Sequence, residues 1–372
     1  MRRSLPRAEG LETDMLIYWV LIAAVFAFGL LFCRDGRGKA FYCAACGAVL
    51  FMIAAVRRSV GYDYNLYANW FDDCFGMSFD DMSVMKQEKG FLLPMRLISG
   101  LTFDYQAMFA VTALVITAGV MLYIYKNCEK PYLGVFCFIA YGLFFNSMNF
   151  MRQMIAAVIM LYAFRYIKTG QFGRFFVFVL LASCFHVSVL VMIPFYFILR
   201  IPMNNITLGI YAAVTAVCYI FSRQIVSFVT GYFYSEYSLE TSAELAKGVD
   251  PVYSIFFGVT FAAAYLVKKE ICEKSEDGNI LINCMFFTFF FELMGTHHGV
   301  ISRLAVLFFI PAVTVLVPEV ICILPEKSEH LMKDGRNASA TVKIIIASFC
   351  LFMYGYMLAN NYNGVVPYQT VL

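Results

Sequence analysis

Two basic side chains in the largely apolar stretch from Phe145 to Ser188 are of types that could take part in binding or catalysis. Arg152 and His186 each sit among apolar residues, and two expected helical crossings separate them. A charged group deep in a bilayer costs about 3 kcal/mol or more, so it usually faces a partner, a cavity or a ligand. Because two crossings return the chain to the side it left, both residues can face one compartment. Together they predict a site for an anionic, lipid-borne ligand.

Further polar candidates are expected on the same side of the membrane. They come from the long segment 57–105, from the start of the span that carries Arg152, and from a later stretch, ELMGTHHGVISR. These candidates are Arg57, Asp63, Tyr64, Tyr67, Gln153, Glu292 and Arg303. The tyrosines could instead form an interfacial aromatic belt, and Arg303 could simply pair with Glu292.

The other candidates also have structural explanations. Arg57 could flank a helix end, and Asp63 could cap a turn after Gly61. Arg152 could form a structural salt bridge, and His186 could be a satisfied core histidine. The functional interpretation depends on their joint arrival at one face.

The composition determines which elements must position these residues. The chain has 372 residues, of which 61% are hydrophobic and 14% charged, whereas soluble domains are about a quarter charged. Apolar runs of about 14–20 residues recur along the whole length, which predicts an all-α, polytopic transmembrane helix bundle. The net charge of +3 gives no indication of nucleic-acid binding. Most of the twelve cysteines lie in apolar runs, so no disulfide framework is expected.

The hydropathy pattern predicts about 10–12 spans in one membrane domain, residues 15–372, after a polar N-terminal extension, residues 1–14. The expected crossings are Met15–Phe32, Ala40–Val56, Gln106–Tyr125, Tyr132–Phe145, Met151–Ile167, Phe172–Phe185, Val187–Leu199, Thr207–Phe221, Pro251–Val267, Ile280–Gly295, Leu304–Leu324 and Ile344–Leu358.

One crossing depends on dividing Gln171–Arg200 near His186. As a single helix this stretch would be about 45 Å long, well beyond a hydrocarbon core of about 30 Å. The division also places more lysine and arginine in the loops of one side, which the positive-inside rule favours. It puts segment 57–105, Arg152 and His186 on the outer side of the membrane.

Three motifs in this sequence resemble those of the EpsG family of bacterial polysaccharide polymerases, which are Wzy-like. The first runs from Arg57 through Val60-Gly61-Tyr62-Asp63-Tyr64 to Tyr67, with Tyr62 where the family usually has threonine. The second is Phe145-Asn146 followed by Met151-Arg152-Gln153-x-Ile155-Ala156, and the third is Ala182-x-x-Phe185-His186-x-Ser188. Arg303 and the closing Pro367-Tyr368 are weaker similarities. The resemblance extends over nearly the whole chain from Met15.

The resemblance implies a glycosyltransferase that polymerises undecaprenyl-diphosphate-linked repeat units into exopolysaccharide, capsule or O-antigen. Such a site needs forked cations for the diphosphate and a base for the acceptor hydroxyl. We expect Arg152 and Arg303, with Arg57 as a third, to bind the diphosphate. His186 is the expected base, with Asp63 and Glu292 as alternates. Gln153, Tyr64 and Tyr67 are expected to orient the sugars or the lipid head.

Two other functions remain open from the sequence: a membrane glycan O-acyltransferase and a polysaccharide transporter or flippase. No metal site is expected, because His297 and His298 are adjacent rather than spaced i, i+4. The resemblance likewise implies no cofactor. The expected partners are the lipid-linked glycan, membrane lipid and other polysaccharide-assembly proteins, with no nucleic acid.

Overall fold

The fold consists of helices. A computed structural model describes residues 8–33, 38–225, 248–331 and 335–371. Within these ranges the regular elements are helices. One isolated antiparallel β-bridge also pairs Arg57 with Thr370. The all-α, polytopic prediction is confirmed. Of the expected N-terminal extension, residues 1–7 lie outside the described part, and α1 already begins at Ala8.

The chain divides into two compact units, which are described separately. The first comprises residues 1–162, 177–190 and 344–372, and the second comprises residues 163–176 and 191–343. The first unit contains α1 (Ala8–Phe32), α2 (Lys39–Ala55), α3 (Tyr64–Asp73), α4 (Phe79–Val84), α5 (Lys89–Ser99), α6 (Gln106–Asn127), α7 (Pro131–Ala140), α8 (Leu143–Asn149) and η4 (Tyr362–Gly364). Four elements contribute residues to both units: α9 (Met151–Lys168), α10 (Phe172–Ser183), η1 (Val187–Val191) and α21 (Gly335–Ala359).

The second unit contains the remaining helices of the described chain. They are α11 (Met192–Ile198), α12 (Asn205–Ile220), α15 (Pro251–Leu266), α16 (Lys268–Lys274), α17 (Gly278–Gly295), α18 (Gly299–Ser302), η2 (Arg303–Ala305), α19 (Val306–Pro311), η3 (Ala312–Leu316) and α20 (Val317–Leu331). α17 packs against both α15 and α19 within this unit. Phe287 and Phe291 of α17 contact Phe308 of α19 through aromatic rings that buttress the interface.

Fewer helices reach membrane-spanning length than the sequence predicts. Five described helices are long and apolar enough to cross a membrane, or up to seven if each bent pair is one span. In one pair, α7 and α8 meet at 56° around Gly142, whose φ of +78° favours glycine. Four further apolar helices of 10–17 residues coincide with expected crossings: Lys39–Ala55, Phe172–Ser183, Val187–Ile198 and Asn205–Ile220. Hydropathy locates an apolar helix, whereas its length depends on where the backbone turns.

The break near His186 lies where the sequence predicts it. α10 ends at Ser183, a turn follows in which the amides of Phe185 and His186 both donate to the carbonyl of Ala182, and η1 begins at Val187. This turn leaves polar backbone groups available. One of them, the carbonyl of Cys184, accepts a 2.8 Å hydrogen bond from the amide of Gly90.

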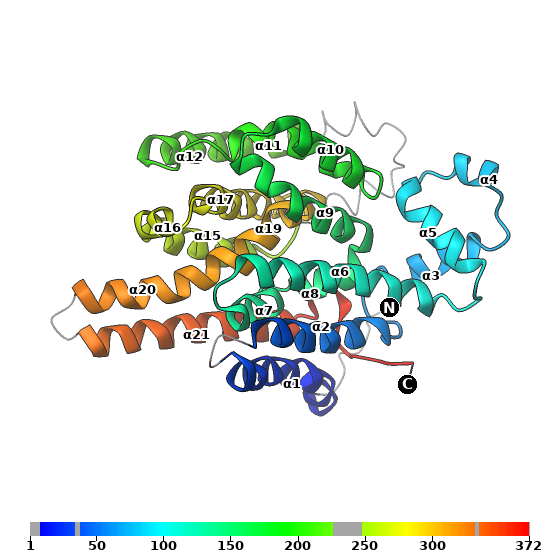
Figure 1. Ribbon diagram of the computed structural model, residues 1–372, viewed down its shortest axis with the longest axis horizontal. Coiled ribbons are helices and arrows are strands. Elements are labelled where there is room, and N and C mark those ends of the chain that lie inside the picture. The colour runs from blue at the N-terminus through cyan, green and yellow to red at the C-terminus, as the bar shows by residue number, and fades with distance from the viewer. Residues whose placement is uncertain (1–7, 34–37, 226–247, 332–334, 372) are drawn as a thin grey trace. The chain divides into compact units, whose positions relative to one another are not determined.

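Segment 57–105 folds into three short helices, α3, α4 and α5 (Figure 1). α5 corresponds to the amphipathic stretch Gly90–Leu101 of this segment, and it buries Phe91, Leu92 and Met95. Phe91 packs against Tyr67 of α3 with ring centroids 5.6 Å apart. This packing fixes α5 against α3. The first turn of α5 carries the residues that lie next to the helix break at Cys184–His186.

Candidate functional site

A carboxylate at the start of α5 brings together the two basic residues singled out in the sequence. Glu88 is the N-cap residue of α5, and its Oε2 accepts a salt-bridging hydrogen bond from Arg152 Nη1. Its Oε1 lies 2.9 Å from His186 Nδ1 and also accepts from the amide of Val187 at 3.2 Å. We call Glu88, Arg152, His186 and Trp70 the Glu88 cluster. All four residues belong to the first unit.

Aromatic side chains orient the arginine. The Arg152 guanidinium lies over the Trp70 ring, with 4.8 Å from Cζ to the ring centroid. Trp70 packs edge-on against Tyr67, which is buried and interacts electrostatically with Arg152. Such cation–π stacking holds a planar guanidinium in one orientation. Tyr67 therefore supports the cluster through its contacts with Trp70 and Arg152.

The cluster is charged and partly open to solvent. The side chains of Glu88, Arg152 and His186 are 15%, 22% and 25% exposed. Burial opposes ionisation of Glu88, but the hydrogen bond from His186 and the charge of Arg152 outweigh it and lower the pKa of Glu88 to about 2. Glu88 therefore stays a carboxylate throughout the physiological range.

Unsatisfied polar atoms occur in and beside this cluster. Arg152 Nε, Gln87 Oε1 and Ser188 Oγ are buried without a hydrogen-bond partner. Gln87 precedes Glu88 in the chain, and Ser188 follows Val187. Since buried polar groups are nearly always paired, such orphans mark a place where polar ligand atoms would be stabilised.

Arg57 occupies a different environment from the one expected of a diphosphate ligand. It is only 1% exposed, and its guanidinium donates to the carbonyls of Met148 at 2.8 Å and Ala54 at 3.0 Å. Its Cζ also lies 4.8 Å from the Phe109 ring centroid. This placement matches the alternative in which Arg57 closes a helix end, here joining α2 to α8.

Replacing Arg57 with alanine should destabilise the protein strongly. The change removes two buried hydrogen bonds and leaves the two carbonyls unsatisfied, at a cost of about 3 kcal/mol or more. Thermal unfolding in detergent measures the effect. Its matched control is Arg58→Ala, because Arg58 is exposed and adjacent. An equal loss of stability in both variants would contradict the structural role of Arg57.

Two asparagines of α8 join the C-terminal tail to the rest of the first unit. Asn146 Oδ1 accepts from Asn363 Nδ2 at 2.6 Å, and Asn149 Nδ2 donates to the carbonyl of Asn363 at 2.9 Å. Tyr368 donates to the carbonyl of Ile53 at 2.8 Å. The conformation of the α8–α9 turn, and thereby the start of the helix that carries Arg152, is tied to this tail.

Three other residues predicted for the site, Asp63, Tyr64 and Gln153, also lie in the first unit. Tyr64 is buried, stacks on Phe109 and donates to Gln106 Oε1 at 3.1 Å, and Gln153 is also buried. Asp63 is the N-cap residue of α3 and is partly exposed. These positions support a packing role for Tyr64.

Glu292 and Arg303 belong to the second unit, so the structure describes them separately from the Glu88 cluster. Glu292 is buried in α17, and Arg303 begins η2. Nearby, His297 stacks on Tyr219 and its Nδ1 lies 2.6 Å from Ser222 Oγ. In the described residues, no three His, Cys, Asp or Glu side chains are grouped as a metal would require.

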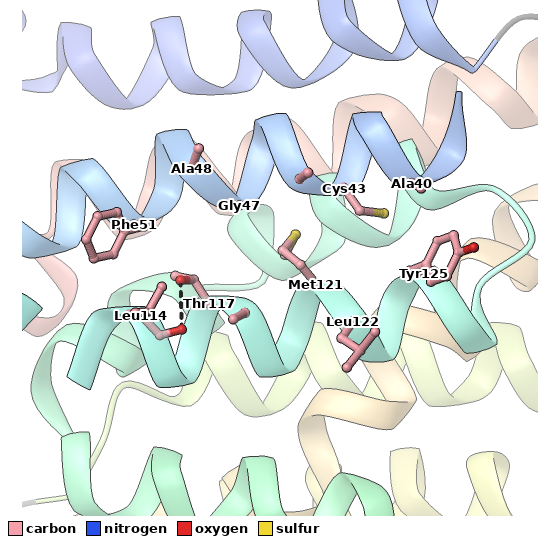
Figure 2. Close-up of a pocket in the computed structure, with 12 residues that line it drawn as sticks. Ala40, Cys43, Gly47, Ala48, Phe51, Leu114, Thr117, Met121, Leu122 and Tyr125 are labelled. Atoms are coloured by element: carbon pink, nitrogen blue, oxygen red, sulfur yellow. Dashed lines mark hydrogen bonds between the residues drawn. The ribbon is translucent and has the colours of Figure 1, made fainter. Parts of the chain in front are cut away.

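A separate apolar groove of about 540 Å³ lies between α2 and α6 in the first unit. Figure 2 shows Ala48, Cys43 and Met121 among its lining side chains, and no residue of the Glu88 cluster lines it. Its lining contains no carboxylate, imidazole or guanidinium. The groove therefore offers packing surface rather than reaction chemistry.

Glu88 is the residue that sequence reasoning missed. It is one of several acids in segment 57–105, and nothing in local hydropathy distinguishes it from Asp72 or Asp104. A weak signal existed: Glu88 lies two residues before the amphipathic stretch Gly90–Leu101, at a position where an acidic residue favours a helix start. Its partners lie 64 and 98 residues away in the chain.

The model of the EpsG family matches residues 39–370, which is nearly the whole chain. No curated protein and no solved structure matches.

Proposed function

This chain belongs to the EpsG family, a polysaccharide biosynthesis family, and from that membership we propose that it polymerises lipid-linked oligosaccharide repeat units. The substrate is an undecaprenyl-diphosphate-linked glycan, and the product is an exopolysaccharide, capsule or O-antigen chain. The reaction takes place on the outer face of the cytoplasmic membrane. The observation that carries the proposal is the convergence of Arg152 and His186 on one partly exposed carboxylate.

The cluster supplies both kinds of group that this transfer needs. The acceptor hydroxyl oxygen attacks the anomeric carbon of the donor sugar, and the bond from that carbon to the diphosphate oxygen breaks. The electron pair leaves on the lipid diphosphate, and the hydroxyl proton passes to His186. A guanidinium stabilises the leaving diphosphate through charge-assisted, forked hydrogen bonds, the role proposed for Arg152. Atoms and charges balance without a further reactant.

The tautomer of His186 suits a base. If Nδ1–H donates to Glu88, the second ring nitrogen, Nε2, carries a free lone pair that can accept a proton. The contact with a carboxylate also stabilises the imidazolium that forms. Arg303 is proposed as an additional diphosphate ligand, and Asp63 and Glu292 are alternate bases.

Purified protein in lipid vesicles, incubated with lipid-linked repeat units, tests the proposal. We expect longer glycan chains on the lipid carrier, and we expect the same result in excess EDTA because arginine rather than a metal ion would hold the diphosphate. Acetylated units would indicate an O-acyltransferase, and unchanged units moved across the bilayer would indicate a flippase. Loss of chain growth in EDTA, restored by one divalent ion, would overturn the arginine-based mechanism.

A further inference from the structure

Glu88 is shared by the two residues to which the proposed function gives separate tasks. We propose that Glu88 is a positioning residue that couples donor binding at Arg152 to the strength of His186 as a base. The inference rests on the proposed function for the identity of the donor. A diphosphate would compete with Glu88 for Arg152, and the released carboxylate would then interact with His186 as its single ionic partner.

The two carboxylate oxygens have different partners, which makes such an exchange possible. Oε2 contacts Arg152, whereas Oε1 contacts His186 Nδ1 and the amide of Val187. If Arg152 turns toward a diphosphate, the Oε1 contacts remain. A diphosphate carries more negative charge than a carboxylate and accepts forked hydrogen bonds, so it can compete for the guanidinium.

The backbone keeps Glu88 beside the break when Arg152 is engaged elsewhere. The amide of Gly90 donates to the carbonyl of Cys184 at 2.8 Å, and a Cβ at Gly90 would lie only 2.4 Å from that oxygen. The neighbouring Lys89 ammonium is held by the carbonyls of Met82, Ser83 and Met85. Among the described residues, Arg152 and His186 are the ionic partners recorded for Glu88.

The charges around His186 determine the sign of the effect. Glu88 on α5 favours the imidazolium, and Arg152 on α9 opposes it. Two further titratable groups are nearby. Tyr67 on α3 interacts with Arg152, and the Cys184 thiol at the break donates a hydrogen bond to the carbonyl of Leu180. When a diphosphate neutralises Arg152, the opposing charge is removed and Glu88 is no longer shared. His186 then accepts a proton more readily, so the base becomes strongest when the donor is in place.

The variant Glu88→Gln separates this role from a structural one, because it moves binding and turnover in opposite directions. Inorganic pyrophosphate should bind the variant about fivefold more tightly, since no carboxylate competes for Arg152. Chain extension should nevertheless fall about 10- to 100-fold, since His186 loses the negative charge that stabilises its imidazolium form. Glu88→Asp should recover part of the rate. Asp72→Asn, an exposed acid in the same segment, should behave like the wild type.

A second measurement does not need chain extension. In protein with isotope-labelled histidine, pyrophosphate should raise the pH midpoint of the His186 resonances in the wild type. The rise should be clearly smaller in Glu88→Gln, where neutralisation of Arg152 still acts but no carboxylate is released to His186. The spectrum of His186→Gln assigns these resonances among the four histidines.

Three outcomes would overturn the inference. The first is a pH midpoint of the wild-type His186 resonances that does not change with pyrophosphate. The second is weaker pyrophosphate binding together with slower turnover in Glu88→Gln. The third is unchanged turnover in that variant. If Glu88→Gln does not fold, the wild-type titration and Glu88→Asp still decide. A wild-type protein that fails to extend lipid-linked units would refute the proposed function, while the titration continues to test the coupling.

Discussion

Replacing Arg152 with alanine should reduce chain extension at least about 100-fold, while the protein still inserts and accumulates. The guanidinium is the cation that stacks on Trp70 and reaches the carboxylate beside His186. Its loss leaves no forked donor in the cluster for the leaving diphosphate. Arg152→Lys should fail almost as severely, because lysine keeps the charge but loses the planar fork.

Product length on reconstituted protein, with the folded yield from size-exclusion chromatography, measures this effect. Arg165→Ala is the matched control, since Arg165 lies on the same helix, α9, and is exposed. Full activity in Arg152→Ala would remove the diphosphate role and leave the structural salt bridge with Glu88 as the explanation. Full activity in Arg152→Lys would reduce the requirement to a point charge.

Replacing His186 with glutamine should lower turnover about 10²- to 10⁴-fold with little loss of donor binding, the range that a general base typically contributes. The amide of glutamine can still accept a hydrogen bond, but it cannot take up a proton at neutral pH. Initial rates at saturating donor, compared with pyrophosphate binding, separate the two effects. His330→Gln is the control, because His330 is exposed and lies in the second unit.

The pH dependence of the wild type should agree with this assignment. The rate should fall as the solution is acidified from about pH 8 to about pH 5, since a protonated imidazole cannot act as a base. The lowered pKa of Glu88, about 2, keeps its carboxylate ionised over that range, so the acid limb does not report Glu88. An unchanged rate in His186→Gln would transfer the role of base to Asp63 or Glu292.

Much of the architecture follows from the sequence because it depends on local properties. The apolar runs determine the helical class, and the excessive length of Gln171–Arg200 together with its charge pattern predicts the break that the structure has at Cys184–His186. The number of full-length spans is less predictable. A turn such as that at Gly142 shortens or bends a helix without changing its hydropathy.

The environment of each candidate depends on tertiary structure. Arg57 and Arg152 both lie in recognisable motifs, yet one is buried against backbone carbonyls and the other is partly exposed in the cluster. Residue type and spacing predicted that Arg152 and His186 would share a face. That Glu88, rather than another acid of its segment, pairs with both was decided by the packing of α5 against the break. Pairing across 64 and 98 residues is a property of the folded backbone, which a local sequence pattern does not encode.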